Sequence, residues 1–78
     1  MLIRESLEKI PVNPNEKRLG EYLIEQGILL ENATVRTVAK EVFLAPSSVV
    51  RFVQKLGFEG FNDFKKQYLE EIRYLSTH

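Results

Sequence analysis

The spacing of apolar residues is the feature that most constrains the fold of this chain. In several segments apolar side chains recur at i, i+3, i+4 and i+7, a spacing that places them on one face of an α-helix. The stripes are Leu19, Tyr22 and Leu23; Val35, Val38, Ala39 and Val42; Val49, Phe52, Val53 and Leu56; and Phe61, Phe64, Tyr68, Ile72 and Leu75. No segment alternates apolar and polar residues with a period of two, so we expect an all-α fold.

Residues that start and end helices divide the chain into five helices. Asn13 is placed to cap a helix that begins at Pro14, and Glu16 stands where a capping box needs a carboxylate. Gly27 ends that helix, and Thr34 is the expected N-cap of the next one. We expect a compact bundle with helices over about 2–9, 14–26, 35–42, 46–56 and 61–75.

Length and composition restrict what such a bundle can do. The chain has 78 residues, which is enough for one small domain, and we expect the apolar connector Ile28, Leu29 and Leu30 to be tucked under the helices. Cysteine is absent, and the single histidine is His78. Disulfides and thiolate chemistry are therefore excluded, and we expect no catalytic or metal site built on a single histidine at the last position. We expect a protein that is not an enzyme and needs no cofactor.

The hydropathy pattern predicts no membrane-spanning segment. No apolar run approaches the roughly 20 residues that span a bilayer, and charged side chains interrupt the first ten residues. We therefore expect no membrane partner and a cytoplasmic location.

The segment 35–56 has the spacing of a helix-turn-helix. Only Phe43, Leu44 and Ala45 separate its two short amphipathic helices, and so short a break sets them at a steep angle. The small side chain of Ala39 suits the point where the helices cross, and the apolar side chain of Leu44 suits the inside of the turn.

The second of these helices presents polar side chains opposite its apolar stripe. The outward positions are Ser47, Arg51 and Gln54, flanked by Ser48, Val50 and Lys55. Such a set fits the major groove of double-stranded DNA. Arg51 can pair with guanine and Gln54 with adenine, Val50 can touch a thymine methyl group, and the serines can reach phosphates or bases.

Positive charge gathers on this segment although the whole chain has no net charge. Residues 34–58 hold four basic side chains, Arg36, Lys40, Arg51 and Lys55, against the single acidic residue Glu41. We expect Arg36 and Lys40 to face the DNA backbone. An excess of three charges is a modest attraction, so useful affinity would need a homodimer on paired half-sites. The apolar terminal residues Leu2, Ile3, Leu7 and Leu75 suit either a dimer contact or packing within the chain.

The stretch from Ser48 to Phe61, SVVRFVQKLGFEGF, closely resembles the recognition-helix signature of the RpiR family of bacterial transcription regulators. The run Asn13-Pro14-Asn15-Glu16-Lys17 is similar to an earlier helix start in that family. The resemblance implies a DNA-binding domain, residues 1–78 here, in a regulator of sugar or phosphosugar metabolism. It also implies a C-terminal sugar-isomerase-like domain that binds a phosphosugar effector and is absent from this chain, as in a fragment.

Three positions depart from the family pattern. Phe43 stands where glycine is common, so we expect a wider turn. Ala45 stands where a capping serine is common, which removes a cap worth about 1 kcal/mol, and we expect Ser48 to replace part of it. Gln54 stands where a basic residue is frequent. The alternative function is a small protein-interaction module that docks a partner helix without binding DNA, which the zero net charge favours.

Overall fold

The computed structural model describes residues 2–77, so Met1 and His78 lie outside the described residues. Within that range the chain is all-α, as expected, and contains no strand. The elements are α1 (Ile3–Lys9), α2 (Pro14–Gln26), a 3₁₀ helix η1 (Gly27–Asn32), α3 (Val35–Glu41), α4 (Pro46–Lys55) and α5 (Phe61–Thr77). Each expected α-helix is present, with ends that agree to within two residues.

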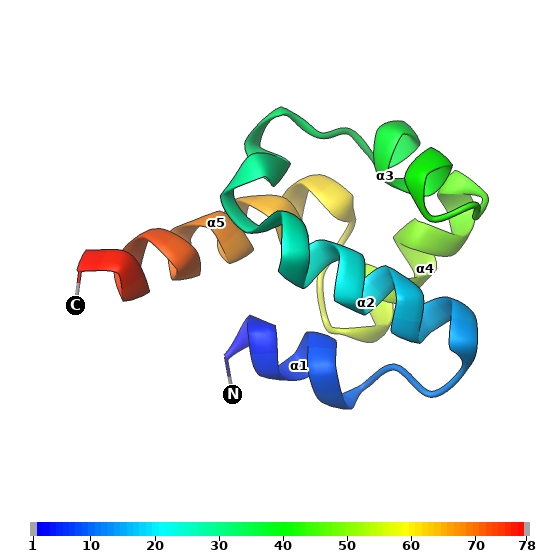
Figure 1. Ribbon diagram of the computed structural model, residues 1–78, viewed down its shortest axis with the longest axis horizontal. Coiled ribbons are helices and arrows are strands. Elements are labelled where there is room, and N and C mark those ends of the chain that lie inside the picture. The colour runs from blue at the N-terminus through cyan, green and yellow to red at the C-terminus, as the bar shows by residue number, and fades with distance from the viewer. Residues whose placement is uncertain (1, 78) are drawn as a thin grey trace.

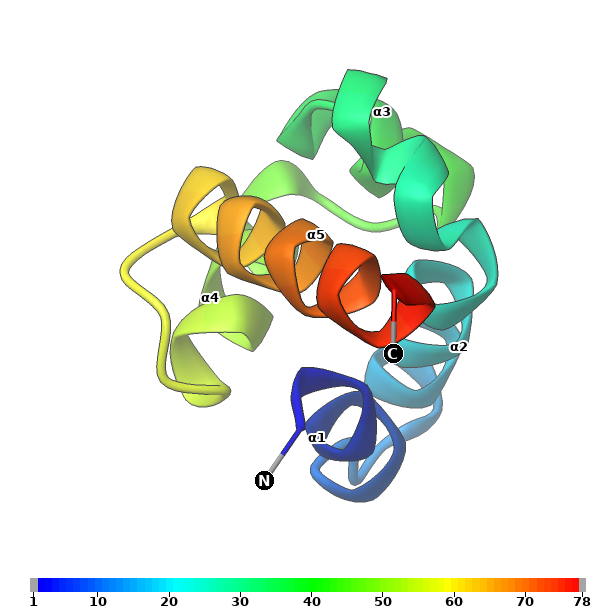
Figure 2. The same ribbon diagram turned by 90° about the vertical axis from the view of Figure 1, so that its left-hand side faces the viewer.

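The helices form two pairs around the central helix α5. Figure 1 shows α1 beside α2 on one side, α3 and α4 together at one end, and the last turns of α5 projecting at the other. In the view down α5, the remaining elements surround its first half (Figure 2). The helix-turn-helix pair therefore stands at the end of the molecule opposite the C-terminus of α5.

Aromatic side chains fill the core between α4 and α5. The ring of Phe64 is fully buried and lies 5.5 Å from Phe58, 6.1 Å from Phe61 and 5.4 Å from Tyr68, measured between ring centroids. The Phe58 ring meets it edge-on, an arrangement that adds stabilisation beyond burial. These rings are held inside the bundle.

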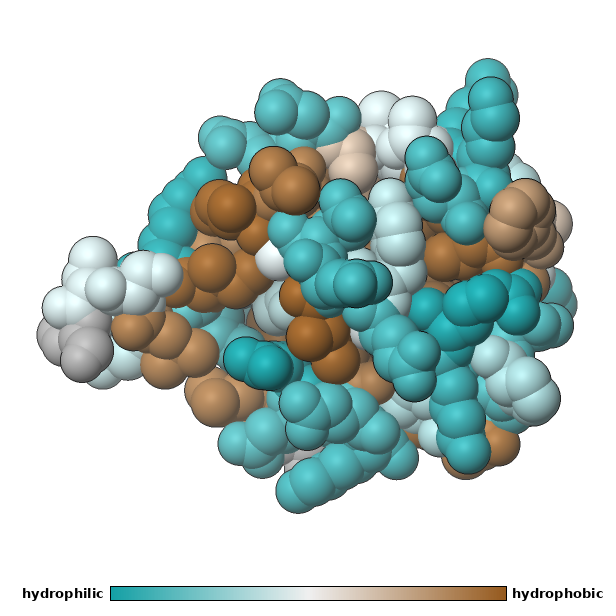
Figure 3. Space-filling view, in the orientation of Figure 1, coloured by the Kyte–Doolittle hydropathy of each residue, from teal (hydrophilic) through white to brown (hydrophobic). Residues whose placement is uncertain are grey.

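The connector after α2 differs from the expectation. Gly27 ends α2 with a positive φ of 52°, and the chain then forms the 3₁₀ helix η1. Leu30 is buried as expected, but Ile28 and Leu29 are exposed, so the prediction that all three are tucked under the helices was wrong. In a 3₁₀ helix only every third residue returns to the same side, which turns Leu30 and Ala33 inward. Ile28 and Leu29 therefore leave apolar side chains exposed on η1. Figure 3 shows an apolar surface where η1 meets α5.

The helix starts follow the sequence signals with one change. Asn13 caps α2, because its side-chain oxygen accepts a hydrogen bond from the Glu16 N–H at 2.8 Å. The expected return bond is displaced by one residue, since the Glu16 carboxylate accepts from the Val12 N–H at 3.1 Å rather than from Asn13. At α3, Thr34 and Thr37 form a complete capping box.

The close approach of α1 to α2 depends on Gly20. A Cβ atom at this position would lie 2.6 Å from the backbone oxygen of Leu7, which cannot move without shifting α1.

Gly20→Ala is therefore expected to lower the free energy of unfolding by about 1–3 kcal/mol, although alanine in a helix interior is normally favoured by about 1 kcal/mol. Urea denaturation followed by circular dichroism measures the change. Gly60→Ala is the control, because a Cβ there meets nothing within 4 Å. A Gly20→Ala protein as stable as the wild type would show that α1 does not pack against α2 as described.

Candidate nucleic-acid interface

The turn between α3 and α4 is tight, and the expectation of a wider turn was wrong. Leu44 donates its N–H to the Ala39 carbonyl at 2.9 Å, and Phe43 donates to the Lys40 carbonyl at 3.3 Å. These two bonds form a Schellman motif at the end of the helix. The motif requires a left-handed backbone conformation at the residue that donates the shorter-range bond. Phe43 supplies it with a φ of 59°. A residue with a side chain adopts this conformation at a cost of about 1–2 kcal/mol.

The same ending closes α4, where glycine fills the left-handed position. Phe58 donates to the Val53 carbonyl and Gly57 to the Gln54 carbonyl, both at 3.0 Å, and the φ of Gly57 is 107°. The two turns thus have the same hydrogen bonds, and only the residue in the left-handed position differs between them.

Burial of the α4 stripe confirms the geometry expected for a helix-turn-helix. Val49, Phe52 and Val53 are buried, and Leu56 is partly buried against the core. They pack with the buried α3 side chains Val38 and Ala39, and with Val42, the residue that follows α3. Leu44 is partly buried inside the turn, as its apolar character predicted.

The predicted DNA-contacting residues all lie at the surface of α3 or α4. The exposed ones are Ser47, Arg51, Gln54 and Lys55 on α4, and Arg36 and Lys40 on α3. Ser48 and Val50 are half-buried beside them. The structure thus brings the eight residues onto one pair of helices, while their contact with DNA stays a prediction.

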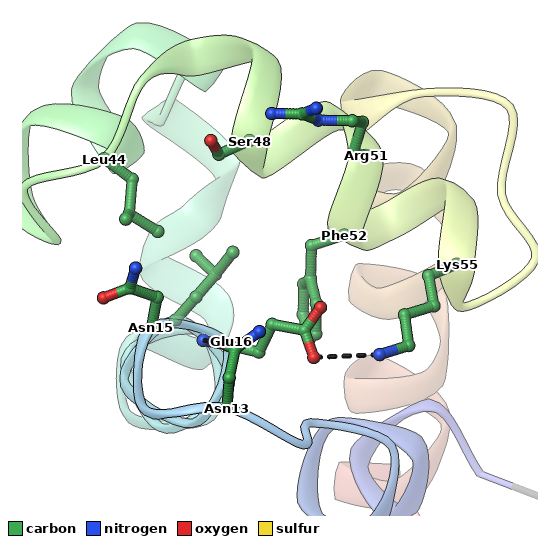
Figure 4. A pocket seen from close by; sticks show the side chains of 9 residues that line it. Asn13, Asn15, Glu16, Leu44, Ser48, Arg51, Phe52 and Lys55 are labelled. Carbon is green, nitrogen blue, oxygen red and sulfur yellow. Dashed lines mark hydrogen bonds and ion pairs between the residues drawn. The ribbon is translucent and has the colours of Figure 1, made fainter.

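A groove of about 340 Å³ separates α4 from the start of α2. It is lined by Asn13, Asn15, Glu16, Leu19, Leu44, Ser48, Arg51, Phe52 and Lys55. In Figure 4 the guanidinium group of Arg51 extends along α4 toward Ser48, above the polar side chains of α2. In the sequence, Asn13 and Asn15 indicate only the start of a helix. Their place beside Arg51 depends on how α2 packs against α4, which no spacing in the sequence reveals.

An ion pair ties the last turn of α4 to α2. The Lys55 ammonium lies 2.9 Å from the Glu16 carboxylate, as the dashed line in Figure 4 marks. Hydrogen bonds from Lys55 and from the Val12 N–H lower the pKa of Glu16 below its ordinary value of 4.5. The pair directs the charge of Lys55 toward α2, so a phosphate near Lys55 must compete with Glu16.

The side chain of Gln54 is also engaged within the protein. Its amide donates to the Glu59 carbonyl at 3.1 Å, and the Glu59 N–H donates to the Asp63 carboxylate at 3.0 Å. The latter bond is the main cause of the lowered pKa of Asp63. This chain of bonds joins the end of α4 to the start of α5.

Arg18 is a residue that the sequence analysis missed. Its guanidinium group donates to the Val42 carbonyl from Nε at 3.0 Å and from Nη2 at 2.8 Å, and Nη2 also contacts the Asn15 side-chain oxygen at 3.2 Å. A cation is favoured at the end of a helix, where carbonyl groups lack partners. Arg18 thereby fixes the end of α3 to α2. The acceptor is a backbone carbonyl 24 residues away, so no motif could have indicated it.

The start of α4 lacks a side-chain cap among the described residues. Ala45 occupies the capping position, and Ser48 contributes only a backbone N–H bond to the Ala45 carbonyl at 2.9 Å. The expectation that Ser48 would replace the missing cap was wrong, because its side chain lies in the groove. Pro46 has no N–H and the Ser48 N–H is bonded to the Ala45 carbonyl, which leaves the Ser47 N–H as the donor of the first turn that an anion can bind.

Comparison with known families agrees with this geometry. Residues 1–74 match the model of the helix-turn-helix domain of the rpiR family. The chain belongs to this family. The match places it among the helix-turn-helix domains of transcription regulators, and confirms the resemblance based on the α4 sequence.

The chain is also similar to a curated protein that is described as a transcriptional regulator. The chain is 36% identical over 74 residues to an uncharacterised HTH-type transcriptional regulator of Clostridium perfringens (strain 13 / Type A). The aligned part covers 92% of this chain and 26% of the relative, so this chain spans about a quarter of that protein's length. No solved structure matches the chain significantly. Within residues 2–77, no helix is long and apolar enough to cross a membrane.

The Glu16–Lys55 pair predicts a pH-dependent contribution to stability. Because the folded protein lowers the pKa of Glu16, the pair stabilises it above pH 4.5 and loses this effect as the pH falls through the lowered pKa. Glu16→Gln is expected to cost up to about 1 kcal/mol at neutral pH. The difference from the wild type should shrink toward about pH 3 in urea denaturation.

Glu25→Gln is the control for this experiment, because Glu25 is an exposed acidic residue on the same helix. Its cost at neutral pH should be smaller than that of Glu16→Gln, because Glu25 forms no ion pair among the described residues. An equal cost of Glu16→Gln at both pH values would contradict the assignment of the ion pair.

Proposed function

We propose that this rpiR-family domain binds double-stranded DNA in a sequence-specific manner, with α4 in the major groove and α3 across the backbone. One observation carries the proposal: Val49, Phe52 and Val53 are buried, which leaves Ser47 and Arg51 exposed on the opposite side of α4. An α-helix with its side chains is about 10–12 Å in diameter, which fits a major groove about 12 Å wide. The function is binding rather than catalysis.

The exposed side chains of α4 suit different parts of the duplex. Arg51 offers a bidentate pair to guanine, and Val50 offers an apolar contact to thymine. Ser47 and Ser48 lie in the uncapped first turn, where their hydroxyl groups and the Ser47 N–H suit a phosphate. Gln54 can pair with adenine only by giving up its bond to the Glu59 carbonyl.

Electrostatic attraction to DNA is modest. Arg36 and Lys40 are exposed on α3 and suit the phosphate backbone, but Glu16 offsets the charge of Lys55. Few phosphate contacts mean low affinity for one copy, so we propose a homodimer on half-sites about one helical turn apart.

An apolar surface that suits a second copy lies at the other end of the domain. Leu7 is buried in the core, which assigns it to packing within the chain, but Leu2 and Leu75 are exposed. A groove of about 320 Å³ beside Leu75 is lined partly by Ile24 and Ile72. These apolar side chains favour a contact with the partner copy.

The regulatory part of the proposal comes from the family resemblance. We propose that the domain works in a longer cytoplasmic regulator of sugar or phosphosugar metabolism, whose sugar-isomerase-like domain binds a phosphosugar effector. The greater length of the Clostridium relative supports this view.

Salt dependence tests DNA binding against the alternative of a protein-interaction module. The test uses duplexes selected from a random-sequence pool at a stated salt concentration. Affinity for them should fall steeply as the salt concentration rises, because phosphate contacts release counterions. A partner helix docked in an apolar groove would respond little to salt. Failure to select any duplex, or binding that ignores salt, would refute the proposed function.

Arg51→Ala is expected to weaken binding to the selected duplex by about 1–3 kcal/mol and to relax specificity at one base pair. Lys9→Ala is the matched control, because it also removes one exposed cation but lies on α1. Fluorescence anisotropy measures both affinities. Equal affinity of Arg51→Ala and Lys9→Ala would remove Arg51 from the interface.

A further inference from the structure

We propose that Phe43, in the turn before α4, is an apolar DNA contact at the edge of the recognition site. The inference rests on the proposed function. It adds a DNA-contacting residue that neither the apolar periodicity of the helices nor the groove between α4 and α2 indicates. Phe43 combines two unusual properties. It is 86% exposed, the highest value among the exposed large apolar residues, and it is the one non-glycine residue with positive φ in the described chain.

The ring of Phe43 contributes little to the packing of the folded domain. The turn requires a left-handed residue, and Gly57 meets the same requirement at the end of α4 with the same two hydrogen bonds. A phenylalanine in this position is strained, and its exposed ring contributes little burial. A strained residue that does not contribute to folding is a candidate for a role in binding.

The position of Phe43 points to DNA rather than to protein. It precedes α4 by three residues, and Ala45, Pro46 and Ser47 around the helix start are exposed. The N-terminal part of a recognition helix is the part that contacts bases. A ring in the adjoining turn therefore lies near the wall of the groove that α4 enters.

The surroundings of Phe43 argue against a protein partner. From residue 35 to residue 55, all of which the structure describes, it is the one large apolar side chain that is exposed. A stable protein interface buries at least about 1,000 Å², whereas an aromatic side chain offers about 150–250 Å². DNA presents apolar groups singly, as thymine methyl groups in the major groove and as the edges of deoxyribose rings. One isolated ring suits such a target.

The test compares Phe43→Gly and Phe43→Ala with the wild type on the selected duplexes. Both variants remove the ring, so each should bind about tenfold more weakly, as the loss of one apolar contact predicts. The slope of log affinity against log salt should not change, because an apolar contact releases no counterions. Phe43→Gly should also melt a few degrees higher than Phe43→Ala, since only glycine relieves the strain.

A stabilised Phe43→Gly protein that binds less tightly is the result expected from the proposal. Unchanged affinity would overturn it. A loss of affinity with a reduced salt slope would also overturn it, because α4 would then have moved away from the phosphates. Val12→Ala removes an exposed apolar side chain outside α3, the turn and α4, and should bind as the wild type does.

Duplexes with deoxyuridine in place of thymidine identify the atoms that Phe43 touches. If the ring packs against a thymine methyl group, the difference between the wild type and Phe43→Gly disappears on these duplexes. If it packs against deoxyribose, the difference persists. Wild-type protein that selects no duplex would refute the proposed function itself, which is a separate result from unchanged affinity of the variants.

Discussion

The packing of α4 against α3 is the interaction on which the rest of this structure depends. Val49, Phe52 and Val53 are shielded from water by contact with Val38 and the residues around it. Burial of such side chains contributes about 1.5–3 kcal/mol each before the entropy cost of ordering them. Because one side of α4 is committed to this contact, the opposite side has to face solvent. The chemistry available to a partner is therefore set by the polar residues between the apolar ones.

Polar bonds from α2 hold this pair of helices in place. Arg18 binds the carbonyl at the end of α3, and Glu16 binds Lys55 in the last turn of α4. The two residues are two positions apart on α2, so one helix contacts both parts of the helix-turn-helix. This arrangement fixes the orientation of α4 relative to the rest of the domain, and it restrains a cation that would otherwise be free to meet a phosphate.

The turn shows how a local conformational rule can be met in two ways. Both α3 and α4 end with a left-handed residue and the same pair of hydrogen bonds, yet one uses glycine and the other phenylalanine. The backbone geometry is similar because the hydrogen bonds determine it. The difference lies in free energy, since phenylalanine is strained there and glycine is not.

Local patterns in the amino-acid sequence predicted the helices and the inward face of α4. Apolar periodicity and caps depend on residues within a few positions of one another, so the five α-helices, the Asn13 and Thr34 caps and the exposure of Arg51 followed from the sequence alone. These patterns did not predict the 3₁₀ helix that exposes Ile28 and Leu29. An uninterrupted run of apolar residues does not show which of its side chains will face the core.

The contacts of the polar residues depend on how the helices pack, which local patterns do not reveal. The partners of Lys55 and Arg18 lie far along the chain, at Glu16 on α2 and at Val42 after α3, and the acceptor for Arg18 is a backbone carbonyl, a group that every residue has. Spacing along the chain contains no information about such contacts, since they form only when helices pack in three dimensions. The groove beside Arg51 arises in the same way, from the place of α2 against α4.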